Sequence, residues 1–299
     1  MNNKTLAYIG LIVANIAWAA GASVSKATMA VFPPALLSAL QIAIASVVLL
    51  VIQRRGGYPA VRKQDRWPMV GLSMVMNVAG FLLGYVGIAL SLASDISLLV
   101  IAEVLFTALL ARWLLREHID RARWLSLAVG AVGAVILITG SIGNNTATAP
   151  NRVLGGVLFL RDLLCCAYYT VRGGVFLARN DTVGMMTYVN LVSLVVWVPV
   201  LLYYIVTGQF PAVTTASVVG LLYQSLVTSV LCIFLSFYAV KVIGATATTI
   251  VLFVQPLFGA LIGVTMLGDP ITSSGIVGAV CVFGSIAMSM RSQLREGQQ

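Results

Sequence analysis

Residues 93–119 read ASDISLLVIAEVLFTALLARWLLREHI, and residues 245–271 read ATATTIVLFVQPLFGALIGVTMLGDPI. Each segment contains an apolar run, a polar exit and the start of another apolar run. A duplicated block of membrane helices is the usual plan of a secondary transporter, so this repeat decides which fold we expect. A constant offset pairs residues of the same or similar chemistry: Ala93 with Ala245, Glu103 with Gln255, Phe106 with Phe258, Leu115 with Leu267, Glu117 with Asp269 and Ile119 with Ile271.

The composition is that of a membrane protein. Hydrophobic residues make up 60% of the chain and charged residues 9%, and the mean hydropathy is +1.01. A soluble domain carries about 25% charged residues. The net charge of +9 could indicate nucleic acid, but the basic residues lie in short loops between apolar runs. The positive-inside rule and the anionic inner membrane surface explain them better, so we expect a lipid bilayer as partner and no nucleic acid.

Ten apolar stretches follow one another along the chain, and a membrane-spanning helix needs about 20 such residues. The first stretch is too long for the apolar region of a signal peptide, so we expect it to be a mature helix. The sequence predicts an all-α membrane protein with ten transmembrane helices, near residues 6–31, 35–52, 68–90, 95–114, 122–140, 153–178, 183–206, 214–240, 244–266 and 273–290.

A polar Gly/Asn/Thr-rich linker at 141–152 divides these helices into two sets of five. We expect a first repeat at 1–140, an extracytoplasmic linker, a second repeat at 153–290 and a cytoplasmic tail at 291–299. With the N-terminus in the cytoplasm, 14 lysines and arginines lie in inside segments and one, Arg152, lies outside, so both termini are predicted to be cytoplasmic. Because five is odd, the second repeat must enter the membrane inverted.

Catalytic and metal-binding chemistry have little support. The four cysteines lie inside apolar runs without a C-x-x-C pair, and the single histidine, His118, lies in a charged loop. We therefore expect no metal, no cofactor and no enzymatic activity.

Specific residues resemble a known family. The run from Tyr238 to Lys241, the pair Gln255-Pro256 and the segment from Leu267 to Ile271 resemble the second repeat of the EamA-type drug/metabolite transporters, and Trp18 and Tyr168 are similar to the repeat openings. The whole chain resembles the aromatic amino acid exporters of that superfamily, the YddG type. The resemblance implies export of aromatic and other neutral amino acids from a bacterial cytoplasm across the inner membrane. It also implies a cavity lined mainly by the first, third, fourth, sixth, eighth and ninth helices.

Glu103 lies about eight residues into its helix, roughly 12 Å along the axis at 1.5 Å per residue. A charge at that depth is a functional hypothesis by default: it can carry a coupling proton, bind a substrate ammonium, or hydrogen-bond a neighbouring helix. Its repeat partner Gln255 cannot titrate, so a symmetric pair of proton carriers is excluded.

Other polar residues share helical faces. Arg161, Cys165, Tyr168 and Arg172 are spaced by 4, 3 and 4 residues, which keeps them on one face. An arginine there can bind a carboxylate beside a stacking aromatic ring, whereas an Arg161–Asp162 interhelical pair and snorkelling of Arg172 are the structural alternatives. The remaining candidates for a cavity lining are Trp18, Asn77, Gln224 and Tyr238, each with packing as the alternative.

These residues predict a secondary transporter that exports small metabolites, above all amino acids, by alternating access through a central cavity. Both proton-coupled exchange and facilitated diffusion are compatible with these residues, and protons are the candidate coupling ion in the first case. Proton-coupled multidrug efflux is the alternative, and it predicts dependence on Glu103.

Overall fold

The computed structural model describes residues 3–116, 121–139, 149–243 and 254–296, and the regular structure within these ranges is helical. The linker at 141–148, Glu117, His118 and residues 244–253 lie outside the described ranges. The helices are α1 (Asn3–Thr28), α2 (Pro34–Arg55), α3 (Lys63–Ser73), η1 (Met74–Gly80), α4 (Phe81–Leu90), α5 (Ala93–Leu99), α6 (Ile101–Leu114), α7 (Arg121–Thr139), α8 (Arg152–Leu177), α9 (Thr182–Val206), α10 (Thr215–Leu222), η2 (Tyr223–Cys232), α11 (Ile233–Ile243), α13 (Val254–Leu267) and α14 (Ser273–Glu296).

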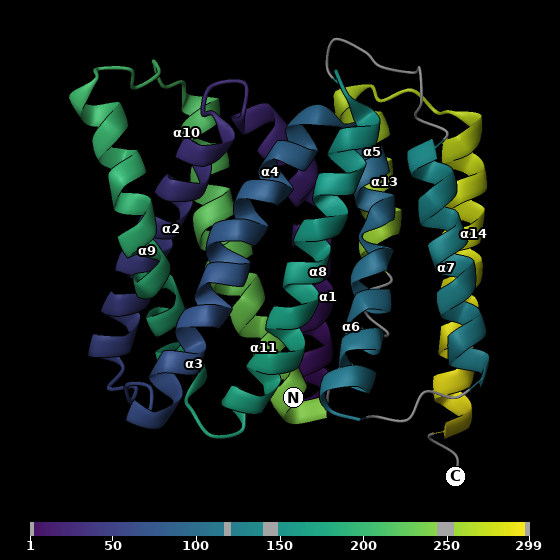
Figure 1. Ribbon diagram of the computed structural model, residues 1–299, viewed down its shortest axis with the longest axis horizontal. Coiled ribbons are helices and arrows are strands. Elements are labelled where there is room, and N and C mark those ends of the chain that lie inside the picture. The colour runs from purple at the N-terminus through teal and green to yellow at the C-terminus, as the bar shows by residue number, and fades with distance from the viewer. Residues whose placement is uncertain (1–2, 117–120, 140–148, 244–253, 297–299) are drawn as a thin grey trace.

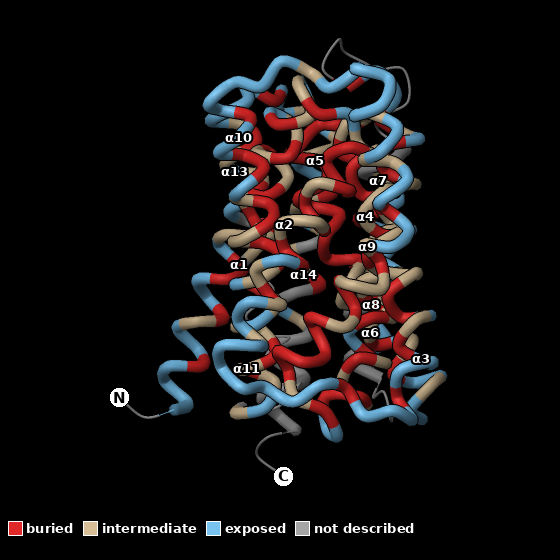
Figure 2. Tube along the Cα trace, turned by 90° about the vertical axis from the view of Figure 1, so that its left-hand side faces the viewer, coloured by how far each residue is buried: buried red, intermediate tan, exposed pale blue. Residues whose placement is uncertain are grey.

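The prediction of a helical membrane protein is confirmed. By length and composition, seven of the described helical segments can cross a membrane: Asn3–Thr28, Pro34–Arg55, Lys63–Leu90, Ala93–Leu114, Arg152–Leu177, Thr182–Val206 and Thr215–Val242. Large apolar side chains on the outside of the bundle support this assignment. Val195 is 72% exposed and Val206 is 82% exposed, as expected for side chains that contact lipid. Figure 2 shows the buried segments in the interior and the exposed ones along the outline and at both ends.

The helices stand side by side in one bundle, and both chain termini lie at the same end of it (Figure 1). At one edge α2 packs against α9, and at the other α7 packs against α14. Between these edges, α8 packs against α4 and α6, while α1 packs against α13, η2 and α11. Helices from the two halves of the chain are therefore interleaved rather than separate.

Two π-helical segments interrupt membrane-length helices. In the first half, η1 lies between α3 and α4, and in the second half η2 lies between α10 and α11. π-Helical turns are rare and occur frequently at functional sites. Each interrupts the third of the five predicted helices of its half, so the local distortion is repeated with the sequence.

Close backbone contact joins α4 to α8. A Cβ atom on Gly87 would lie 2.9 Å from the carbonyl oxygen of Gly155, and one on Gly155 would lie 2.8 Å from the carbonyl oxygen of Gly87. Both distances are shorter than real Cβ contacts, so each position requires glycine. Small residues that let backbones approach are the usual means of helix association in membranes, where lipid is as apolar as the side chains.

We predict that Gly87→Ala lowers the free energy of unfolding by about 1–3 kcal/mol, the usual cost of overpacking a tight contact. Gly174→Ala is the matched control, because its Cβ would meet nothing within 4 Å. In a helix, alanine is favoured over glycine by roughly 0.5–1 kcal/mol, so the control should be neutral or stabilising. Denaturation in detergent micelles measures both variants. Equal stability of Gly87→Ala and the parent protein would contradict the contact.

Candidate functional site

Two carboxyl groups lie inside the bundle, one from each half of the chain. Glu103 is in the first turn of α6, and its backbone N–H donates to the carbonyl of Val100 at 2.9 Å. Asp162 is on α8, which begins at Arg152 because the Asn151 side chain accepts a hydrogen bond from the backbone N–H of Leu154 at 3.1 Å. Since α6 packs against α8, the two helices bring the carboxyl groups toward each other.

Asp162 occupies space that two glycines provide. A Cβ atom on Gly80 would lie 3.1 Å from Asp162 Oδ1, and one on Gly84 would lie 2.5 Å from Asp162 Oδ2. The thiol of Cys166 donates a weak hydrogen bond to Asp162 Oδ1 at 3.7 Å. The four-residue spacing of Gly80 and Gly84 is a pattern typical of helix packing in membranes, and here it also makes room for a carboxyl group.

Glu103 borders a small cavity between the halves that is too narrow to hold a water molecule. Its other lining residues are apolar and come from α6, the preceding turn and α13: Val100, Ile101, Val104 and Pro256. Glu103 and Asp162 are close enough to interact electrostatically. Within the described ranges, the ion pairs are Arg152–Asp95 and Arg179–Asp65, and neither includes these two carboxyl groups. An intramembrane acid without a fixed cation can take up a proton or a cationic group.

A network of uncharged side chains extends from Tyr85, which is close enough to Asp162 to interact with it electrostatically. The hydroxyl of Tyr85 donates to Gln41 Oε1. The amide nitrogen of Gln41 donates to Ser229 Oγ at 2.6 Å and to the carbonyl of Gln224 at 3.2 Å. The amide nitrogen of Gln224 donates to Ser25 Oγ at 2.6 Å and to the carbonyl of Gly21 at 2.9 Å. The network connects α4, α2, η2 and α1, and its side chains are buried.

Two more of the sequence-predicted residues make interhelical hydrogen bonds. Trp18 Nε1 donates to the carbonyl of Thr228 at 3.2 Å and ties α1 to η2. Asn77 faces α9. Its side-chain Nδ2 donates to Ser193 Oγ at 3.3 Å, and its backbone carbonyl accepts from Trp197 Nε1 at 2.9 Å. Both π-helical segments therefore hold a neighbouring helix through backbone carbonyls.

Two other predicted residues lie on α11 and α13. Tyr238 packs with the cluster of Ala7, Leu11 and Ala239 between α1 and α11. Gln255 is partly buried at the start of α13, next to Pro256 of the Glu103 cavity.

Arg161 and Tyr168 lie on another face of α8. Arg161 is exposed and Tyr168 partly buried. This face also carries Leu154, Val157 and Leu164, which are exposed apolar side chains. The structure thus separates these two residues from Asp162, although Arg161 is its neighbour in the chain.

Sequence reasoning overlooked Asp162, Tyr85 and Gln41 as site residues. The available signal for Asp162 was a second carboxylate deep in an apolar run, together with the Gly80/Gly84 spacing on another helix. Gln41 had a similar signal, because it is an amide in the middle of an apolar stretch.

No three His, Cys, Asp or Glu side chains come together as a metal site within the described ranges.

Comparison with known proteins identifies a family, transporter relatives and a shared fold. Residues 5–139 and 153–291 each match the sequence model of the EamA-like transporter family. The chain is 23% identical to the uncharacterised transporter YetK from Bacillus subtilis (strain 168), over 95% of this chain and 86% of YetK. It is 23% identical to an uncharacterised transporter from Archaeoglobus fulgidus, over 98% of this chain and 99% of that protein. One protein of known crystal structure shares the fold with a TM-score of 0.67 and 17% identity, covering 97% of this chain and 98% of that one.

We predict that Gln41→Ala lowers the free energy of unfolding by about 1–3 kcal/mol, because Tyr85 and Ser229 lose buried hydrogen-bond partners on another helix. Ser38→Ala is the control on the same helix: Ser38 is also buried, but its hydroxyl donates only to the carbonyl of Pro34 one turn away. Thermal unfolding in detergent compares the two. A Gln41 variant as stable as the Ser38 variant would show that the network does not hold the helices together.

Proposed function

The chain belongs to the EamA-like transporter family, and we propose that it is a secondary transporter that exports aromatic and other neutral amino acids from the bacterial cytoplasm. Membership of the family and relatives named as transporters make it a multi-pass membrane transporter. The substrate class, the direction of transport and the location in the inner membrane are parts of the proposal.

The proposed architecture is ten transmembrane helices in two inverted five-helix repeats, at 1–140 and 153–290, with both termini in the cytoplasm. The separate matches of the two halves to one family model support the repeat. The position of a π-helical segment in the third helix of each half supports it further. Inverted repeats place the substrate near the middle of the bilayer at their interface.

One observation carries the proposal most strongly: an acid from each half, Glu103 and Asp162, lies beside a buried amide and hydroxyl network. An ammonium group can pair with the carboxylates, while amides and hydroxyls can bind a substrate carboxylate or backbone. The aromatic rings of Trp18 and Tyr85 belong to the same interior and can contact an apolar side chain. A phosphate ester would instead need several converging cations.

The same pair of acids favours a second candidate, proton-coupled efflux of cationic lipophilic compounds. Carboxyl groups deep in a membrane protein are characteristic of proton relays in pumps and transporters. This alternative differs from the first in its substrate. Permanently charged organic cations would compete with protons for Glu103 and Asp162, whereas the amino acids of the first candidate carry no net charge.

Counterflow in proteoliposomes separates the two candidates. Vesicles are preloaded with one amino acid at a time, and uptake of labelled counterpart is followed with and without a pH gradient. Exchange of aromatic or other neutral amino acids supports the exporter. Movement of cationic dyes together with a failure to exchange any amino acid contradicts it and supports drug efflux.

We predict that Glu103→Gln and Asp162→Asn each abolish accumulation driven by a pH gradient, because neither amide can release a proton. Substrate exchange in the absence of a pH gradient should persist in any of these variants whose new amide group still binds the substrate. Asp65→Asn is the matched control, since Asp65 pairs with Arg179 at the end of the bundle and not with the central acids. Transport with unchanged rate and pH response in both central variants would remove these acids from the coupling mechanism.

A further inference from the structure

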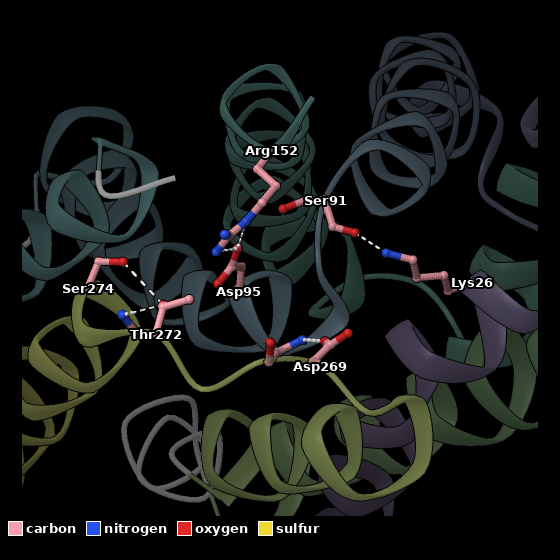
Figure 3. A network of polar contacts seen from close by, with 9 residues as sticks. Lys26, Ser91, Asp95, Arg152, Asp269, Thr272 and Ser274 are labelled. Carbon is pink, nitrogen blue, oxygen red and sulfur yellow. Dashed lines mark hydrogen bonds and ion pairs between the residues drawn. The ribbon is translucent and has the colours of Figure 1, made fainter. Parts of the chain in front are cut away.

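A second group of charged residues lies at the end of the bundle opposite the termini (Figure 3). It contains two cations, Lys26 and Arg152, and two anions, Asp95 and Asp269. Lys26 is near the end of α1 and Asp95 in the first turn of α5, whereas Arg152 begins α8 and Asp269 follows α13. Each half of the chain thus supplies one cation and one anion.

The ion pair between Arg152 and Asp95 joins the two halves. Arg152 donates from Nε at 2.9 Å and from Nη2 at 2.6 Å to Asp95 Oδ2. The side chains are only 1% and 9% exposed. A buried pair of this kind is costly to break on one side, because the remaining charge is left uncompensated.

A second connection between the halves is made by Asp269. Its Oδ2 accepts a hydrogen bond at 2.8 Å from the backbone N–H of Ser94, and Asp269 is 7% exposed. A Cβ atom on Gly263 would lie 2.8 Å from Ser94 N and 3.1 Å from Asp269 Oδ2. The glycine therefore allows α13 to approach α5 closely enough for this bond.

Lys26 completes the group from α1. Its ammonium donates to the carbonyl of Ser91, in the turn between α4 and α5, and it interacts electrostatically with Asp269 and Asp95. The four charges balance. The side chains of Arg152, Asp95 and Asp269 are shielded from solvent, and the bonds run across the boundary between the halves. This arrangement is suited to hold the two halves together at the end of the bundle opposite the termini.

We propose that Lys26, Asp95, Arg152 and Asp269 form an outer latch, which closes the extracytoplasmic end of the transport path and must break before that end opens. The proposal rests on the alternating access and orientation proposed above. It assigns these residues a conformational role: they set the balance between the outward-closed and outward-open states, and they do not bind the substrate.

Thiol labelling tests the latch without any substrate. The reporter is Ala22→Cys, in a protein whose four native cysteines are replaced by alanine. Ala22 lies on α1 one turn before Lys26 and packs against the core cluster. A membrane-impermeant maleimide is added to the extracytoplasmic side of intact cells. We expect Arg152→Gln and Asp269→Ala each to raise the labelling rate by about tenfold, a shift typical of coupled conformational equilibria.

Charge exchange and a control at the other end make the test specific. Asp95→Arg combined with Arg152→Asp should restore slow labelling, because the pair is rebuilt with reversed polarity. Asp65→Asn, which breaks the Asp65–Arg179 pair near the opposite end, should not raise the labelling rate. Labelling that stays slow in both single variants would overturn the latch, and so would fast labelling in the exchanged pair.

Two further readouts keep the outcomes distinct. Arg152→Lys, which retains the charge, should label more slowly than Arg152→Gln. If Arg152→Gln fails to fold, the folded Asp269→Ala variant decides the test: fast labelling of that variant supports the latch, and slow labelling of it overturns the latch. Because no substrate is needed, a protein that labels as expected but exchanges no amino acid contradicts the proposed substrate and not the latch. Normal amino acid exchange with unchanged labelling contradicts the latch alone.

Discussion

The constraint on which the rest of the structure depends is that hydrocarbon offers no hydrogen-bond partners. A polar side chain inside this bundle therefore needs a partner within the protein, and where that partner lies on another helix, the bond fixes the position of one helix relative to the other. Gln41, Tyr85 and Gln224 connect four helical segments in this way, and Asn77 connects η1 to α9. The polar residues of the sequence are few, but they decide which helices are neighbours and at what rotation.

Glycine makes these polar contacts possible. Gly80 and Gly84 leave the volume that the Asp162 carboxyl group occupies, and Gly263 leaves the approach that Asp269 and Ser94 need. In both places a methyl group would meet a polar atom rather than another apolar surface. The small residues of this chain thus serve two purposes at once: they bring helices together, as is usual in membranes, and they admit charged groups into positions that larger side chains would fill.

The central acids and the outer latch are carried by the same helices. Arg152 and Asp162 both lie on α8, and Asp95 and Glu103 lie on the consecutive helices α5 and α6. A rigid movement that separates Arg152 from Asp95 must also change the spacing between Asp162 and Glu103. The proposed latch therefore offers a mechanical link between binding of a proton or a cationic group at the acids and opening of the outer end. Such a link is what alternating access requires, because occupancy of the central site has to influence which end is open.

The sequence by itself determined the membrane class, the helical architecture, the duplicated plan and the family, and it singled out Glu103 as an intramembrane acid. The membrane class and the helices follow from local composition, because about 20 apolar residues suffice to specify a spanning helix whatever its neighbours are. The duplicated plan follows from the repeat, and the family from the resemblance of particular residues to it. Only the tertiary structure decided which side of each helix faces the interior. Arg161 and Asp162 are adjacent in the chain, yet they point about 100° apart around α8, and only the positions of α4 and α6 determine that Asp162 is the inner one. The partners of Gln41, Arg152 and Asp269 come from helices far away in the sequence, so no local pattern could have identified them.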